Sequence, residues 1–284
     1  MEKIASSVNL LKEWLVQQPH LPKNVPEFFL SKCYIACNNS IEVAKNLIDL
    51  FFTLRSRAPD LFANRNLDDP DIQDSFEIFD MIELSETVND CKVCIVRLNS
   101  DNIDKFHCAA SVKLFTMFND LQIFTDDRLC EGEIFIVDLE KSNLKLLTKI
   151  SLMHIKKVAE YSQEARPLKL KQVHFVNVQP IIEKFLLLIK PFLKAEVINM
   201  FNLHQDIETL YKFVPKDVLP KDYGGTDSKT IPEYKKEVEA KLRKYKHVID
   251  DKSYVTVDES KRPIGNPYGD KFGMQGSFRT LDID

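Results

Sequence analysis

Glycine is scarce in this sequence, with 7 glycines in 284 residues, and only Gly132 precedes Gly224. Neither G-x-G-x-x-G nor G-x-x-x-x-G-K-[ST] occurs, so the sequence offers no glycine-rich loop whose backbone amides could cradle a phosphate. The G-x-S-x-G turn that presents the nucleophile of α/β-hydrolases is also missing. These absences argue against a nucleotide-binding enzyme and against a serine hydrolase.

Long apolar runs and a surplus of positive charge are missing as well. No apolar run approaches the length needed to span a bilayer, and residues 1–18 are amphipathic rather than like a signal peptide. The formal net charge of -4 gives no global attraction to nucleic acid. At 44% hydrophobic and 29% charged residues, the chain has enough apolar material for a full core. We therefore expect a folded cytoplasmic protein with no nucleic-acid partner.

The cysteine pattern does not favour a metal site. Cys91 and Cys94 form a C-x-x-C, but no second C-x-x-C and no H-x-x-x-H follows. The pair lies within 91–98, which reads as a strand, and there the odd spacing of three directs the two sulfurs to opposite faces. We expect six reduced thiols, no metal and no cofactor.

The first third of the sequence has helical periodicity. A stripe of apolar residues predicts a helix over 4–16, and helical patterning resumes at 28–37. Ser40 is a predicted N-cap for a helix that starts at Ile41 and ends near Arg55 and Arg57, whose charges suit the helix dipole and need no ligand. Residues 1–65 are thus predicted to form a helical amino-terminal domain, followed by an acidic connector over 66–90.

Strands and helices alternate in the rest of the chain. Strands are predicted at 92–98, at 133–139 and from 171, with helices at 104–121 and 152–163 between them. This order predicts an α/β fold with a mostly parallel sheet over 91–228, in which the last two strands run parallel. Residues 229–284 are predicted to hold a charged helix with a solvated face and an extended tail.

The segment from Lys169 to Phe201 is the most informative stretch. Its strand, 169–176, carries apolar residues on both faces, which is typical of a strand covered on both sides. The helix that follows is apolar nearly all round, and Pro191 should break it, leaving Phe192 to Asn202 as a separate or kinked piece. Such a jointed apolar helix beside a sheet is either plain core or a lid.

Six short segments follow one another in a characteristic order. They are Phe29-Leu30 with the block 44–59, Gly132 with 136–139, Pro167-Leu168-Lys169, residues 174–177, residues 189–193, and Leu219-Pro220 with Tyr223-Gly224-Gly225. Together they resemble the CRAL-TRIO lipid-transfer family, of the α-tocopherol transfer protein and cellular retinaldehyde-binding protein type, and the resemblance covers about residues 25–225. Their order and spacing make a chance match improbable.

The resemblance implies a helical CRAL-TRIO-N domain and a sheet-floored cavity that holds one hydrophobic ligand. A mobile lid helix, here 181–201, would open at membranes, so peripheral membrane association is implied too. By correspondence the ligand-binding residues would be Val112, Phe115, Thr116, Asn119, Val137, Val158, Tyr161, Leu168, Val173, Phe175, Phe185, Ile189, Leu193 and Val197. Each of these apolar residues has ordinary core packing as its alternative explanation.

Tocopherol-type members also have a four-residue basic cluster at the pocket mouth that contacts phosphoinositide head groups. Lys169 and Lys171 match two of the four positions, whereas Asn46 and Met200 stand at the other two. Binding of phosphoinositide and a solvated strand end are therefore two alternative explanations of these lysines.

The resemblance implies a non-enzymatic carrier that moves one lipophile between membranes. Tocopherols, retinoids, carotenoids, sterols and phospholipids all suit an apolar cavity. One alternative is an adaptor in which the bound lipid is structural or regulatory. A remoter one is a hydrolase using His174 with Asp138 on the neighbouring strand.

Overall fold

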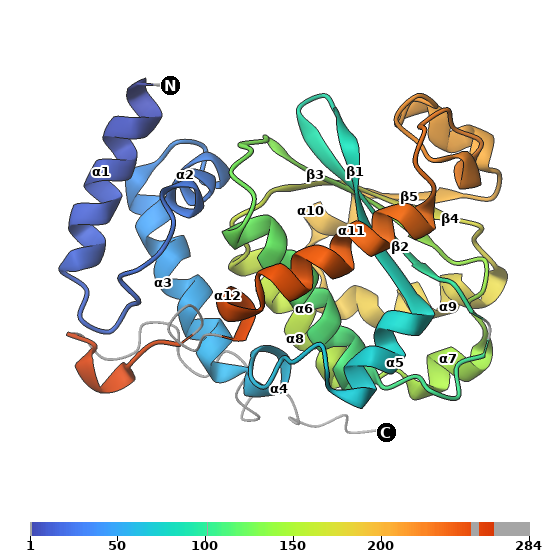
Figure 1. Ribbon diagram of the computed structural model, residues 1–284, viewed down its shortest axis with the longest axis horizontal. Coiled ribbons are helices and arrows are strands. Elements are labelled where there is room, and N and C mark those ends of the chain that lie inside the picture. The colour runs from blue at the N-terminus through green and yellow to red at the C-terminus, as the bar shows by residue number, and fades with distance from the viewer. Residues whose placement is uncertain (1, 101, 251–255, 264–284) are drawn as a thin grey trace, which may run out of the picture.

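A computed structural model describes residues 2–100, 102–250 and 256–263. At its centre is a five-stranded sheet in the order β1-β2-β3-β4-β5 (Figure 1). Only β1 and β2 are antiparallel, and the other neighbours are parallel. The strands are β1 (Phe79–Val88), β2 (Cys91–Leu98), β3 (Gly132–Asp138), β4 (Leu170–Val176) and β5 (Phe201–His204). The predicted α/β class and mostly parallel sheet are confirmed.

The amino-terminal helices lie together at one end of the molecule, drawn in blue in Figure 1. They are α1 (Glu2–Val16), α2 (Glu27–Ala36) and α3 (Ile41–Arg57), and the short α4 (Pro59–Phe62) follows α3 toward the middle of the molecule. Ser40 caps α3 as predicted, because its side chain accepts a hydrogen bond from the backbone amide of Val43. Phe29 of α2 packs on Phe51 of α3 and on Phe124, with ring centroids 5.2 and 5.3 Å away. The helices thus share one apolar core with the end of α6 (Cys108–Phe124).

Apolar layers cover both faces of the sheet. One face carries Cys94 and packs on α6 (Cys108–Phe124), while the other carries Cys91 and packs on residues 207–223 and the start of α11 (Ile231–Lys244). The two cysteines therefore lie on opposite faces, as their spacing predicts. The remaining helices are α5 (Pro70–Ile78), α7 (Leu144–Lys149), α8 (Leu152–Glu164), α9 (Pro180–Ile189), α10 (Ala195–Ile198) and α12 (Lys246–Asp250), with 3₁₀ turns at 190–192, 207–212, 221–223 and 259–261.

Residues 66–90, predicted to be an acidic connector, hold a helix and the first strand of the sheet. Asp69 caps α5 through its side chain, with Pro70 at the first helical position. Beyond this helix, β1 pairs along β2 and buries Ile82 completely. Asp68, Asp69, Asp71 and Asp74 lie at cap and surface positions, whereas Asp80 is buried beside Arg97 and the apolar residues between the acids enter the core.

The segment after β4 breaks at Pro191 as predicted, but its second piece is shorter than expected. α9 ends at Ile189, residues 190–192 form a 3₁₀ turn, and α10 extends only to Ile198. Phe201 and Asn202, predicted as helical, belong to strand β5. The reason is that β4 has a free edge, and the amide of Val173 donates to the carbonyl of Met200 at 2.9 Å, which draws the chain into the sheet.

A buried ion cluster joins the amino-terminal helices to the sheet domain. The carboxylate of Asp120 on α6 forms ion pairs with the guanidinium groups of Arg55 and Arg65, with a nitrogen–oxygen distance of 2.7 Å in each. All three side chains are at most 1% exposed. Burial alone would raise the pKa of Asp120, but the two guanidinium groups lower it below its ordinary value. Arg55 is therefore a buried partner of Asp120, and the helix-dipole explanation from sequence does not account for its position.

Part of the predicted extended tail is described, and it lies along α3. The amide of Val257 donates to Ser56 Oγ at 2.7 Å, and Arg262 donates to Asp49 at 2.8 Å and to Thr53 at 2.8 Å. Residues 264–284 lie outside the described part of the chain. None of the described helices combines the length and apolarity required to cross a bilayer.

Candidate ligand-binding cavity

A cavity of about 870 Å³ lies between the sheet, α8 and the segment that follows α9. Its floor is one face of the strands, where alternate residues point the same way. Val96 of β2 pairs in register with Val137 of β3, which pairs with Phe175 of β4. These side chains, with Phe135 and Val173, form a continuous apolar surface.

Many of the residues implied by the family resemblance surround this cavity. The floor and walls include Phe115, Val137, Val158, Leu168, Val173 and Phe175. Leu193 and Val197 approach from the lid segment, and Lys169 and Lys171 lie at the rim. The structure therefore brings ten of the predicted positions together around one space.

Other predicted residues lie away from the cavity. Thr116 donates to the carbonyl of Leu61 at 3.1 Å, and Tyr161 accepts from Arg55 at 3.1 Å, so both face the amino-terminal helices. Asn119 donates to the carbonyl of Phe115 at 2.9 Å and is 1% exposed. These positions are buried among side chains of the domain junction because α6 and α8 are covered on two sides.

Three apolar candidates also lie outside the cavity lining. Val112 lines a smaller cavity on the other side of Phe115. Phe185 and Ile189 of α9 are half-buried, and it is Leu186 that packs against the apolar cluster of the sheet face. The lid contributes to the cavity mainly through the residues after Pro191 and only indirectly through α9.

Several lining residues were not predicted. Ala36, Cys37, Asn38 and Leu47 come from the amino-terminal helices, and no local pattern in the sequence indicates their approach. Phe135 lies two residues before Val137 on β3, and Val96 pairs with Val137 from β2, so both point to the same face as Val137. Strand alternation alone could have predicted them. The remaining ones are Ala159, Ser162, Gln163, Glu164, Arg166, Leu170, Lys194, Glu196, Met200 and Phe201.

Two polar side chains organise the cavity wall. Arg166 forms a buried ion pair with Glu133, and its guanidinium lies 5.5 Å from the ring centroid of Phe135. Gln163 of α8 donates to the carbonyl of Phe192 at 3.0 Å and accepts from the amide of Lys194 at 2.6 Å. One amide group therefore ties α8 to the backbone of the lid on both sides of Leu193.

The pair considered for hydrolysis does not come together. His174 Nδ1 lies 2.9 Å from His204 Nε2, and its Nε2 lies 3.0 Å from Gln172. Asp138 instead accepts hydrogen bonds from Asn177 and Tyr223, both at 2.8 Å. Burial and the neighbouring His204 lower the pKa of His174 to about 4, so this histidine is a neutral core residue at neutral pH.

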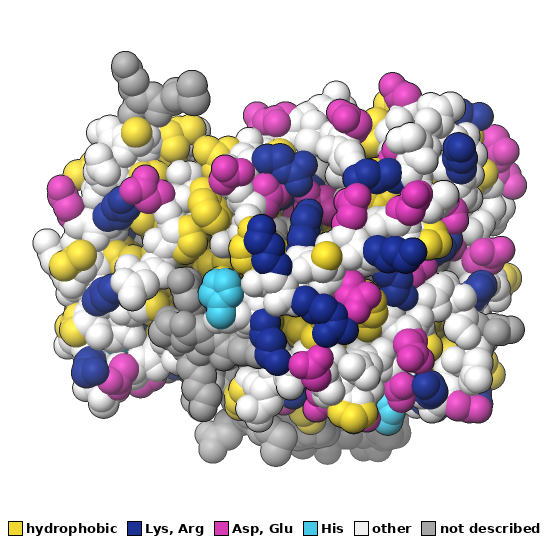
Figure 2. Space-filling model, viewed as in Figure 1, with side chains coloured by type: hydrophobic (Ala, Val, Ile, Leu, Met, Phe, Trp, Pro, Cys, Tyr) yellow, Lys and Arg dark blue, Asp and Glu magenta, His cyan; other side chains and the backbone are white. Residues whose placement is uncertain are grey.

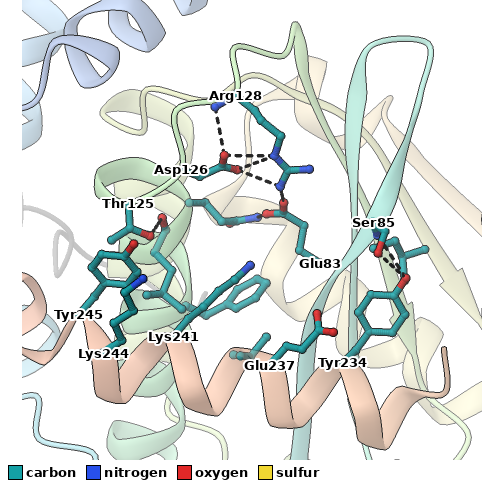
Figure 3. A pocket seen from close by; sticks show the side chains of 15 residues that line it. Glu83, Ser85, Thr125, Asp126, Arg128, Tyr234, Glu237, Lys241, Lys244 and Tyr245 are labelled. Atoms are coloured by element: carbon teal, nitrogen blue, oxygen red, sulfur yellow. Dashed lines mark hydrogen bonds and ion pairs between the residues drawn. The ribbon is translucent and has the colours of Figure 1, made fainter.

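A second surface cavity, of about 440 Å³, is polar (Figure 3). Its walls carry opposite charges that neutralise each other, since Arg128 contacts Asp126 at 2.9 Å and also pairs with Glu83. Tyr234 donates to Ser85 at 3.1 Å at the other end. Figure 2 shows lysine and arginine side chains over α11 with acidic ones between them, as expected of a solvated face. The 870 Å³ cavity is therefore the better candidate for an apolar ligand.

Comparison with known families agrees with this geometry. Residues 84–225, half of the chain, match the family model described as CRAL/TRIO domain. The chain belongs to the CRAL-TRIO family. The resemblance inferred from the six sequence segments is thereby confirmed. Residues 1–72 match a second family model, described as Pinta-like, UBA domain.

Individual relatives of this CRAL-TRIO protein are distant. Alpha-tocopherol transfer protein-like from Homo sapiens is 25% identical over 212 residues, covering 74% of this chain and 61% of the relative. Clavesin-1 from Rattus norvegicus is 27% identical over 186 residues, covering 64% and 52%. The chain thus spans between half and two thirds of these relatives. The crystal structure of Sfh5 superposes with a TM-score of 0.51 at 17% identity, covering 88% and 99% of the two chains, and supports the fold alone.

The mouth of the cavity in this CRAL-TRIO protein is polar. Lys169 donates to Asn38 Oδ1 at 2.5 Å, which links the start of β4 to the turn between α2 and α3. Lys171 lies 3.4 Å from Glu131. Of the two non-basic residues noted from sequence, Met200 lines the cavity and Asn46 lies on α3. The rim therefore presents two lysines beside an apolar interior.

Proposed function

We propose that the protein is a carrier that binds one small hydrophobic ligand in the 870 Å³ cavity and transfers it between membranes. The observation that carries this proposal is the apolar floor made by Val137, Val173 and Phe175, roofed by Leu193 and Val197 of the lid. The volume lies within the range of ligand sites in proteins, and the lining combines carbon with a few polar groups. The names of the relatives, which include a transfer protein, support it further.

The energetics suit a tight carrier without catalysis. A ligand that buries about 400 Å² of apolar surface gains about 10 kcal/mol from transfer out of water. Loss of translational freedom and ordering of the lid consume part of this gain. The remainder is enough for retention in water, and a bilayer, which solvates the ligand equally well, provides the acceptor.

We propose that exchange requires displacement of the lid, residues 180–200. α9 presents Leu187 and Leu188 to solvent, at 65% and 59% exposed, which is a large apolar surface for one short helix. These side chains would enter the lipid surface while the hydrogen bonds of Gln163 to the lid backbone break. Lys169 and Lys171 at the rim would contact anionic head groups, and phosphoinositide is one such lipid.

Native mass spectrometry of the purified protein, followed by solvent extraction of bound lipid, tests the proposal. The expected result is one lipophile per chain, lost in Val173→Trp, where an indole fills the cavity floor. Val43→Trp, at a 52% exposed position of α3, is the matched control and should keep the ligand. A chain without lipid that also takes up none from a mixed panel of tocopherol, retinoid, carotenoid, sterol and phospholipid would contradict the proposal.

Transfer of the bound lipid to vesicles separates a carrier from an adaptor. A carrier should lose its ligand to acceptor vesicles of phosphatidylcholine within minutes. Stable retention in the presence of excess vesicles would instead identify the lipid as a fixed structural element of an adaptor.

A further inference from the structure

A second apolar cavity, of about 260 Å³, adjoins the first one. It lies between the ends of β2 and β3, the start of α6, and α7 and α8. Four side chains, Val96, Phe115, Val137 and Val158, line both spaces and form a wall that the two cavities share. The small cavity is also lined by Phe106, Leu139, Leu146, Ile150 and Ile155.

The small cavity is not a ligand site in its own right. Its volume falls below the roughly 300 Å³ at which ligand pockets begin, and the surface it exposes is almost entirely carbon. Arg97, Ser111, Asp138 and Ser142 belong to the lining but expose almost no polar surface to the cavity, so a ligand held there alone would have little to orient it. Both the small volume of this cavity and the wall it shares with the larger cavity are explained if it is an extension of the larger site.

We propose that the small cavity receives the distal end of the ligand's apolar chain, so that the carried lipophile is a linear single-chain amphiphile. This inference rests on the carrier function proposed above. The polar end of the ligand would lie at the mouth, beside Lys169 and Lys171, and the chain would run under Phe115 past Val137. The two ends of the combined space thus differ in polarity as the two ends of an amphiphile do.

The register of the sheet gives the length of such a chain. The mouth is at Leu170, which pairs with Glu133 at the start of β3, and the small cavity ends beside Leu139. Those six residues of strand span about 20 Å at roughly 3.3 Å per residue. An extended alkyl chain advances about 1.3 Å per carbon for bonds of about 1.5 Å, so about fifteen carbons fit. The large cavity alone, as far as Val137, accommodates about ten.

Binding of dansylated alkylamines by the delipidated full chain tests the inference. Each buried methylene should raise affinity about fourfold, so the hexadecyl probe should bind at least about a hundredfold more tightly than the decyl probe. Ile155→Phe on α8 and Cys108→Phe on α6 each fill the small cavity from a different helix. In both variants hexadecyl affinity should fall to within about tenfold of decyl affinity. Decyl affinity should stay within about twofold of wild type.

The outcomes distinguish this inference from the carrier proposal. If wild type binds decyl and hexadecyl probes equally, or if neither substitution weakens hexadecyl binding, the small cavity does not hold the chain although the carrier function stands. If wild type binds no probe of any length, the inference of a linear ligand fails, and the carrier proposal fails with it only if the mixed lipid panel also gives no uptake.

A measurement on the unmodified protein covers the case in which both variants fail to fold. A hexadecyl probe with a diazirine at its terminal carbon should crosslink to residues 106–112 and 146–155. Crosslinks confined to residues 190–200, the second part of the lid, would overturn the inference.

Discussion

Replacing Asp120 by asparagine should be among the most destabilising single changes in the protein. The carboxylate is 1% exposed and is shared by Arg55 and Arg65, so the substitution leaves two buried cations without their counter-ion while it keeps the side-chain size. Breaking a buried ion pair from one side costs about 3–5 kcal/mol. Two orphaned arginines place Asp120→Asn at the upper part of that range.

Part of the loss is offset by other partners of the two arginines. Arg55 keeps Tyr161 at 3.1 Å and the ring of Phe62, 4.4 Å away, while Arg65 keeps the carbonyl of Ile249 at 2.9 Å. We therefore expect a decrease of about 4 kcal/mol in the free energy of unfolding.

Urea unfolding followed by circular dichroism at neutral pH measures this decrease. Asp104→Asn is the matched control, because its pair with Lys145 is 69% and 60% exposed and should change stability by less than about 1 kcal/mol. If Asp120→Asn costs no more than the control, the cluster does not hold the two domains together and the reasoning is refuted.

Three further predictions concern other parts of the molecule. His174 has a pKa of about 4 in the folded protein and near 6.5 in the unfolded chain, so the unfolded chain binds more protons between these pH values. The free energy of unfolding should therefore fall by up to about 3 kcal/mol as the pH decreases from 6.5 to 4. Urea unfolding at a series of pH values measures this decrease, which should be smaller in His174→Asn. Gly225→Ala should prevent folding or melt well below wild type in calorimetry, because an added Cβ would lie 1.8 Å from the carbonyl oxygen of Leu219. At Gly132 the nearest atoms are the carbonyl oxygen of Lys169 at 2.6 Å and side-chain atoms of Lys171, so Gly132→Ala should also destabilise but less. Equal melting temperatures of the two variants would contradict this. Gln163→Ala removes both hydrogen bonds to the lid, and the loss of about 1 kcal/mol should speed ligand transfer to vesicles about fivefold to tenfold. Gln73→Ala on α5 is the control. An unchanged transfer rate in Gln163→Ala would count against lid opening as the slow step.

The parts of the fold that sequence predicted are those with local causes. Ser40 at the start of α3 and the alternation in β3 and β4 depend on neighbours within a few residues, and both are as expected. The prediction of a connector at 66–90 was wrong, because it relied on the acidic residues and ignored the apolar residues between them, which form the buried sides of α5 and β1. Phe201 was placed in a helix because its strand pairing depends on the edge of β4, which is not local in sequence.

The candidate site divides in the same way. Val173 and Phe175 follow from strand period, and the structure places them on the cavity floor. Asn119 and Tyr161 are on helices covered on two sides, where periodicity marks buried positions without telling which neighbour covers them. Ala36 to Asn38 reach the mouth only through the packing of the amino-terminal helices, which no local pattern encodes.

The two-residue period of β4 also bears on how the protein can change over evolutionary time. Val173 and Phe175 line the cavity, whereas His174 between them belongs to the opposite layer and pairs with His204. Substitutions at 173 and 175 therefore change the cavity side of the sheet, where Phe175 also packs on Phe201 of β5 with ring centroids 5.0 Å apart, whereas changes at 174 act on the opposite layer. Among homologues, positions 173 and 175 should therefore vary with the shape of the cavity, while position 174 should vary together with position 204.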